Sequence, residues 1–136
     1  MPSGSCFCGE TGVSYTGDVA MKALCHCNDC KKITGSVFST NIVVPGEGFE
    51  VKGSPKSISK TADTGNEITS YFCGNCGTTL YRDGASFGTM KVIKAGVMDD
   101  ADIINGTAKP DVELYAPLRT AWQPKLDGSA DKQSMS

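Results

Sequence analysis

Short runs of β-branched, aromatic and aliphatic residues alternate with polar turns along most of the chain. Turn residues gather at 45–50 and 61–67, between such runs. Runs of this composition, bounded by turns, are typical of strands. The expected strands cover residues 12–15, 20–25, 37–44, 49–53, 56–61, 67–73, 78–83 and 90–98. The pattern predicts a mostly β fold.

Short helical turns are expected at two places between these strands. Residues 28–35, NDCKKITG, offer Asn28 or Asp29 as an N-cap and Gly35 as a C-terminal stop. A second short helix is expected over residues 99–104, DDADII. Neither segment is long enough to build a helical layer, so both are expected to connect strands.

Length and composition indicate one small domain. The chain has 136 residues, 39% of them hydrophobic, and 16 glycines, which suggests many turns around a modest core that something besides apolar burial helps to hold. Bound metal is the obvious candidate. We expect a single domain over residues 1–124 and a disordered polar tail over residues 125–136.

Charge and hydropathy exclude several classes of partner. The formal net charge is −2, and Lys31 and Lys32 form the only adjacent basic pair, which argues against a nucleic-acid-binding surface. No apolar run approaches the ~20 residues of a membrane span. The first ten residues, MPSGSCFCGE, lack the features of a signal peptide. A cytoplasmic protein is expected, either monomer or homodimer.

Seven cysteines carry the candidate chemistry: Cys6, Cys8, Cys25, Cys27, Cys30, Cys73 and Cys76. An odd number leaves one thiol over in any disulfide framework, and a reducing compartment keeps thiols open. Two cysteines separated by one residue of extended chain are awkwardly placed for a disulfide. Zinc bound by thiolates at ~2.3 Å suits both the C-x-C and the C-x-x-C spacing. Buried apolar thiols or a redox pair remain the alternative.

Counting ligands divides the cysteines into two sites. Pairing Cys6 and Cys8 with Cys73 and Cys76 gives a closed four-thiolate site that joins distant parts of the chain and acts as a structural staple. Cys25, Cys27 and Cys30 then supply three ligands and leave one position open, which is how catalytic zinc is usually presented. A different division of the seven cysteines is conceivable.

Two neighbouring residues could close the second site. His26 is the only histidine, but alternate side chains of an extended segment point in opposite directions, so it should face away from a metal held by Cys25 and Cys27. We expect it at the surface, although it could donate a proton to an alkoxide. Asp29 is about as weak a candidate, because thiolate-rich zinc seldom needs a carboxylate.

A zinc ion with three thiolates is a poor generator of hydroxide, because its net charge is negative. It is better suited to hold a soft fourth ligand and to lower the pKa of an incoming thiol. The bound sulfur could add to an electrophilic carbonyl or be released from a carbon–sulfur bond. A small thiol or thioether is therefore the expected substrate.

The cysteine motifs and two later segments resemble one known family. They are SCFCG, CHCNDCKKITGS and FCGNCGTTLY, followed by IKAGVMDD and ELYAPLRTAW. Together, from about Ser5 to Trp122, they look like the glutathione-dependent formaldehyde-activating enzyme family, also called the Gfa or centromere-protein-V domain. The resemblance implies a mostly β fold of the Mss4-like (β-tent) group, two zinc ions, and a carbon–sulfur lyase or transferase activity that adds glutathione to an aldehyde such as formaldehyde, or the reverse.

Residue by residue, the resemblance assigns Cys6, Cys8, Cys73 and Cys76 to a structural zinc. It assigns Cys25, Cys27 and Cys30 to a catalytic zinc on the substrate side. A non-catalytic zinc module for interaction or metal buffering is the alternative function.

The charge of glutathione indicates which residues are expected to contact it. Its carboxylates call for basic partners near the second zinc. Lys31 and Lys32 are nearest in sequence, with Arg82 and Arg119 further off, and Lys31, Lys32 and Arg119 are the residues expected to bind glutathione. Trp122 could wall a pocket, although filling the core is the better prediction.

Overall fold

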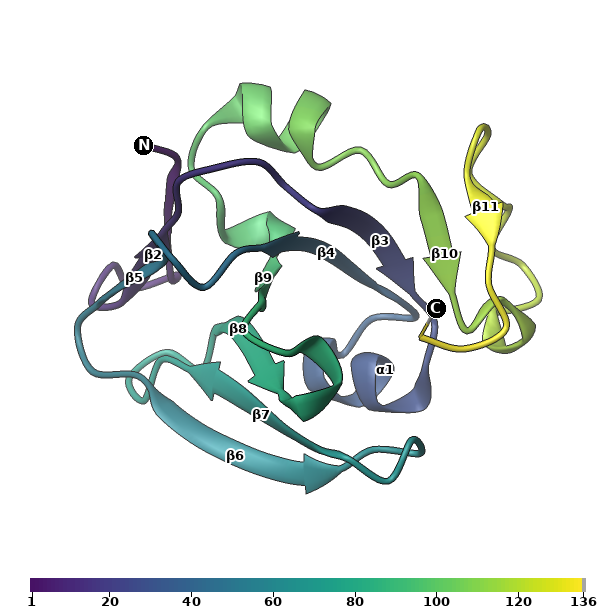
Figure 1. Cartoon of the computed structure of the whole chain (residues 1–136), viewed down its shortest axis with the longest axis horizontal. Coiled ribbons are helices and arrows are strands. Elements are labelled where there is room, and N and C mark those ends of the chain that lie inside the picture. Colours follow the sequence, from purple (N-terminus) through teal and green to yellow (C-terminus); the bar gives the residue numbers. More distant parts are fainter. Residues whose placement is uncertain (136) are drawn as a thin grey trace.

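The computed structural model describes residues 1–135 as two β-sheets with short helical connections (Figure 1). The small sheet has the order β1-β2-β5, and the large one β11-β10-β3-β4-β9-β8-β7-β6. The mostly β prediction is confirmed. In chain order the strands are β1 (Ser3–Ser5), β2 (Gly12–Ser14), β3 (Met21–Cys25), β4 (Ser39–Val44), β5 (Glu50–Lys52), β6 (Lys56–Thr61), β7 (Glu67–Phe72), β8 (Thr79–Gly84), β9 (Lys91–Lys94), β10 (Val112–Leu114) and β11 (Ala130–Asp131).

Every run that is predicted as a strand contains one in the structure. Two details differ from the prediction: the end of one strand and the N-cap of one helix. The segment expected as a strand over residues 90–98 ends at Lys94, because Ala95–Val97 form a 3-10 turn. The helix α1 spans Asn28–Thr34 and ends as predicted at Gly35, whose φ of 70° is left-handed. Its N-cap is Cys27, not Asn28 or Asp29, because the Cys27 sulfur accepts a hydrogen bond from the Cys30 amide.

Further helical turns connect the strands. They are the 3-10 turns Ala85–Phe87 and Ala116–Leu118 and the π-helical turn Ile103–Thr107. With the helical residues 101 and 102 before it, this last turn overlaps the helix expected at residues 99–104 and extends three residues beyond it. Among the described residues there is no helix long and apolar enough to cross a membrane.

The expected disordered tail over residues 125–136 is corrected for the part that the structure describes. Ala130 and Asp131 form β11, which runs parallel to β10. Glu113, on β10, is fully buried and accepts hydrogen bonds from the Leu126 amide and the Ser129 hydroxyl. A buried carboxylate requires such donors, and they hold this segment against the sheet. Ser136 lies outside the described residues.

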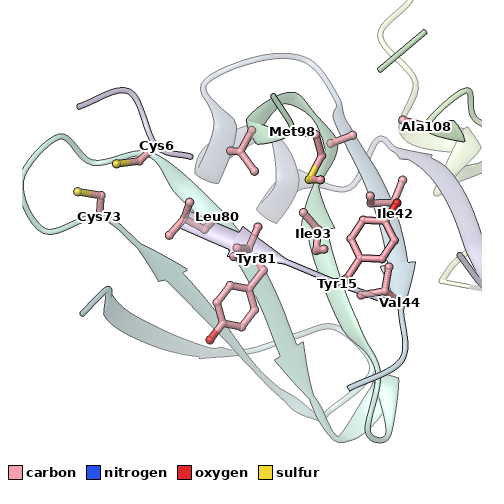
Figure 2. Packing of buried hydrophobic residues seen from close by; sticks show 13 residues of the cluster. Cys6, Tyr15, Ile42, Val44, Cys73, Leu80, Tyr81, Ile93, Met98 and Ala108 are labelled. Atoms are coloured by element: carbon pink, nitrogen blue, oxygen red, sulfur yellow. The ribbon is translucent and has the colours of Figure 1, made fainter. Parts of the chain in front are cut away.

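The main core lies on one face of the large sheet. Ile42 and Val44 of β4, Ile93 of β9 and Leu80 of β8 are fully buried there, in one cluster with Tyr15 beyond β2. Figure 2 shows Cys6 and Cys73 at one end of this cluster, with their sulfur atoms close to one another. The alternate residues of β4, Asn41 and Val43, point to the opposite face, where the cavity described below lies.

Candidate metal centres and the adjoining cavity

The four-cysteine cluster matches the dimensions of a tetrahedral thiolate site. The side chains of Cys6, Cys8, Cys73 and Cys76 place their sulfur atoms within 4.8 Å of one another. The Cys6 and Cys8 sulfurs are 3.6 Å apart, and those of Cys8 and Cys73 are 3.7 Å apart. Sulfurs at ~2.3 Å from one zinc ion lie about 3.8 Å apart. The donor set therefore fits zinc.

Backbone amides of two tight turns point at these sulfurs. The Thr11 amide donates to the Cys6 sulfur at 3.3 Å, and the Asn75 amide donates to the Cys73 sulfur at 3.4 Å. Hydrogen bonding with Thr11 is the largest cause that lowers the pKa of Cys6, to about 5. Gly77 closes the second turn with a φ of 83°, which a residue with a β-carbon rarely adopts. The turns are thus built to present thiolates.

Three cysteines form the second cluster, at the end of β3. Cys25 is its last residue, Cys27 caps α1, and Cys30 lies in the first turn of that helix. Their sulfurs lie within 4.8 Å of one another, and within the described chain no histidine, aspartate, glutamate or further cysteine joins them. A divalent cation here would have three protein ligands, a set that suits zinc.

The three thiols strongly shift one another's pKa. Hydrogen bonds from Cys25 and then Cys27, together with the positive charge of Lys94, lower the pKa of Cys30 to about 2. The same hydrogen bonds raise the pKa of Cys25. Metal binding releases thiol protons, and a cation held by all three sulfurs would take their place.

Neither neighbour that could have closed this site does so. His26 points away from the cluster as expected, but the prediction that it lies at the surface is wrong: it is fully buried, and its Nε2 lies 2.8 Å from Oε1 of Glu113. The parallel pairing of β10 with β3 covers it. Asp29 forms an ion pair with Lys60 at 2.6 Å.

A cavity of about 860 Å³ opens beside the second cluster and is lined by Cys25, Cys27 and Cys30. Its walls combine strand residues of the large sheet with the tip of the β6–β7 hairpin. Figure 1 shows α1 between this hairpin and the place where β3 ends and β4 begins. Across the mouth, the Tyr115 hydroxyl donates to Oδ1 of Asp63 at 2.6 Å. Away from the cysteines, the hairpin tip contributes polar residues such as Thr61, Thr64 and Asn66. The rest of the lining there is largely apolar and includes Met21, Val43, Ile68, Phe87, Met90 and Val92.

Two cations lie at the cysteine end of the cavity and are almost fully buried. Lys94 is 7% exposed, and its Nζ donates to Oδ1 of Asn41 at 2.8 Å. Arg82 is 8% exposed; its Nε donates to the Ser70 hydroxyl at 3.0 Å, and a second nitrogen lies 3.9 Å from the Cys30 sulfur. Neither forms an ion pair with a carboxylate of the described residues. Their charges are therefore available to an anion beside Cys30.

The basic residues expected to contact glutathione lie elsewhere. Lys31 donates to the Leu118 carbonyl at 2.8 Å, Lys32 is exposed, and Arg119 bonds to Glu113 and Asp131. None of the three lines the cavity. Trp122 is 71% exposed, so the prediction that it fills the core is wrong.

Arg82 was only a remote candidate from the sequence, and Lys94 was missed. The alternation of Lys94 with Val92 on one strand was the available signal, because residues two apart share a sheet face.

Comparisons of the sequence with known proteins all point to one family. A family model described as glutathione-dependent formaldehyde-activating enzyme matches residues 1–117. A protein of Emericella nidulans is 31% identical over 84 residues, which cover 59% of this chain and 42% of that protein. One of Podospora anserina is 34% identical over 70 residues, 52% of this chain and 32% of that protein. Both bear the name "Putative glutathione-dependent formaldehyde-activating enzyme". The chain thus spans less than half the length of these curated relatives.

A solved structure has a similar fold. It is a crystal structure of a Rhodobacter sphaeroides protein, with a TM-score of 0.59 and 14% identity. The similarity covers 79% of this chain and 96% of that one. At such low identity it shows a shared fold alone.

Proposed function

Because the chain belongs to the glutathione-dependent formaldehyde-activating enzyme family, we propose that it adds a thiol such as glutathione to an aldehyde, or catalyses the reverse carbon–sulfur cleavage. One observation carries this proposal: three cysteines that can hold a metal open into a cavity of about 860 Å³ beside two buried, carboxylate-free cations. The enzyme would be a zinc-dependent lyase, with Cys6, Cys8, Cys73 and Cys76 holding a second, structural zinc.

Cys25, Cys27 and Cys30 would hold the zinc at which a thiol binds. When bound there, zinc supplies a Lewis-acidic position that lets an incoming thiol lose its proton near neutral pH.

The positive charges of Lys94 and Arg82 offset the negative charge of a metal ion bound by three thiolates. A divalent cation on three thiolates carries a net negative charge, and Lys94 and Arg82 more than balance it. The floor of the cavity is then neutral when one further thiolate enters. Burial lowers the pKa of Lys94, although the neighbouring thiolates oppose this. An anionic guest is thus favoured over a neutral one.

The same cations can stabilise the negative charge that develops on the oxygen of the carbonyl reactant. As sulfur attacks, the carbonyl electron pair moves to oxygen, and Nζ of Lys94 can donate a hydrogen bond to this oxyanion. The thiol proton ends on that oxygen, so the product is a hemithioacetal with no atom lost. In reverse, the same contacts help the sulfur to leave.

X-ray absorption at the zinc edge tests the proposal on the reduced full chain. We expect two zinc ions per chain with an average of roughly 3.5 sulfur ligands, rising toward about 4 when glutathione is added. If both sites are four-sulfur cages indifferent to glutathione, the catalytic proposal is wrong and the non-catalytic zinc module is favoured.

The variant Lys94→Gln isolates the role of charge, because glutamine can still donate to Asn41. Losing a charge-assisted contact of roughly 1.5 to 3 kcal/mol should weaken glutathione binding about 10- to 100-fold, measured by calorimetry on the zinc-loaded protein. Lys31→Gln is the matched control, because Lys31 lies outside the cavity, and it should leave the affinity unchanged. Equal affinities in both variants would show that Lys94 does not face the guest.

A further inference from the structure

The floor of the cavity is one face of the large sheet, and its polarity changes along the strands. Met21, Val43 and Val92 pair across β3, β4 and β9 and form an apolar row. Two residues further along the same strands, the next row is Ala23, Asn41 and Lys94. Because residues two apart share a face, all six side chains belong to the cavity side, and all six line it.

The polar row lies nearer the cysteines, since Cys25 is two residues beyond Ala23 on β3. At the other end, Met90 precedes Val92, and its amide donates to the Phe87 carbonyl at 3.0 Å. Ile68 pairs with Gly84, one residue before the turn that carries Phe87. The cavity therefore has a reactive polar end and an apolar end.

The apolar end matches neither expected reactant. Glutathione is a polar tripeptide with two carboxylates and an ammonium group, which need charged or hydrogen-bonding partners that apolar side chains cannot supply. Formaldehyde has no carbon chain to cover such a surface. A volume of about 860 Å³ is near the top of the range of about 300 to 1,000 Å³ that drug-sized ligands occupy.

We propose that the carbonyl reactant carries a bulky apolar substituent, which lies against Met21, Val43 and Val92 while the reacting carbon faces Lys94. This inference rests on the proposed function and names its substrate class: aldehydes with an alkyl or aryl chain, or the thiol adducts derived from them. The new bond joins the thiol sulfur to the aldehyde carbon, the carbonyl oxygen takes up the thiol proton, and the apolar substituent takes no part in bonding.

Binding of stable thioethers tests this without turnover. S-methylglutathione and S-hexylglutathione differ only in the length of the alkyl chain, and calorimetry on the zinc-loaded, reduced full chain measures both. Each methylene that leaves water improves binding about fourfold, so a hexyl chain buried over roughly half its length should bind about 30-fold more tightly than a methyl group.

The double variant Met21→Gln with Met90→Gln removes apolar surface at two half-buried positions of the lining. We expect it to lower the 30-fold preference to about threefold or less and to leave the affinity for S-methylglutathione unchanged. Ile58→Gln is the matched control: Ile58 is 60% exposed on β6 and does not line the cavity, so this variant should keep the full preference. Thermal melting of all three proteins checks that they are folded.

The other outcomes separate the two proposals. If S-methyl- and S-hexylglutathione bind equally well to the unaltered chain, the inference about the apolar substituent is wrong and the proposed function stands. A preference for hexyl that the double variant keeps also overturns the inference, because the chain then lies elsewhere. If glutathione and both thioethers fail to bind, the proposed function falls, and the inference falls with it.

Discussion

Replacing Glu113 by glutamine tests how the buried network behind the second cysteine cluster supports the fold. Glu113 is fully buried, and its Oε1 lies 2.8 Å from Nε2 of His26 and 3.2 Å from Nε of Arg119. Its other oxygen accepts from Ser129 at 2.6 Å and from the Leu126 amide at 3.0 Å. Glutamine has the same shape, but it removes the charge and turns one acceptor into a donor.

The pKa of Glu113 sets the scale of the effect. Burial alone would raise this pKa, but hydrogen bonds from Ser129, His26 and the Leu126 amide, with the charge of Arg119, lower it from 4.5 to about 2. A lowering of this size corresponds to roughly 3 kcal/mol of stabilisation of the charged form. We expect Glu113→Gln to lower the free energy of unfolding by about 2 to 3 kcal/mol at neutral pH and the melting temperature by roughly 10 °C.

The dependence on pH has a definite sign. Because the folded-state pKa is below the unfolded value, the contribution is fully present above about pH 4.5 and is lost as the pH falls toward 2. The difference in the free energy of unfolding between the unaltered chain and the Glu113→Gln variant should thus be constant from about pH 7 to about pH 5 and shrink below. Loss of metal in acid affects both proteins and largely cancels in this difference.

Urea unfolding of the zinc-saturated proteins, followed by circular dichroism, measures the difference at each pH. Glu67→Gln is the matched control, because Glu67 is exposed on β7, and it should change the free energy of unfolding by less than about 0.5 kcal/mol. A loss for Glu113→Gln as small as that of the control would refute the reasoning. A difference that grows in acid would also refute it.

Two further predictions concern the metal centres and the cavity mouth. Cys27→Ser should release one zinc per chain and leave the circular dichroism spectrum largely intact. Cys73→Ser should unfold the domain, because of the two clusters only the four-cysteine site joins distant segments. A similar loss of melting temperature in the two variants would contradict this division. Tyr115→Phe removes the hydroxyl that donates to Asp63, so it should cost about 1 kcal/mol and speed amide exchange at residues 62–66. Unchanged exchange there would show that this hydrogen bond does not hold the hairpin tip.

The strands that could be predicted from the sequence are those that carry their own signal. The run KSISKT at residues 56–61 contains the β-branched residues Ile58 and Thr61 and is bounded by turns, and it forms β6. β10 and β11 contain only Val112–Leu114 and Ala130–Asp131. Segments so short acquire their conformation from parallel partners distant in sequence, namely β3 for β10 and β10 for β11. No local pattern marks such pairing.

The residues of the candidate site also divide into those that the sequence marks locally and those that only the fold brings together. Cysteine spacing is local, so the pairs Cys6 with Cys8 and Cys73 with Cys76 could be identified, and the structure brings them together. Pairing within the sheet determines which cations lie near the second cysteine cluster. The charge of Lys94 acts on Cys30 from a strand 64 positions later in the chain. Lys31 is adjacent to Cys30 in sequence, but its side chain bonds to the Leu118 carbonyl. Proximity in sequence was a poor guide because a helix turns successive side chains in different directions.

The large sheet explains why the two centres can differ in character. On one face, Ile42, Val44 and Ile93 pack in the same cluster as Cys6 and Cys73, so a metal held by the four cysteines would lie at the edge of the main core. On the other face, the alternate residues Asn41 and Lys94 line the cavity beside Cys25 and Cys30. Since neighbouring residues of one strand serve both faces, packing on the first face fixes the positions of the side chains on the second. The strands that bury the core thus also form the floor of the cavity beside Cys25 and Cys30.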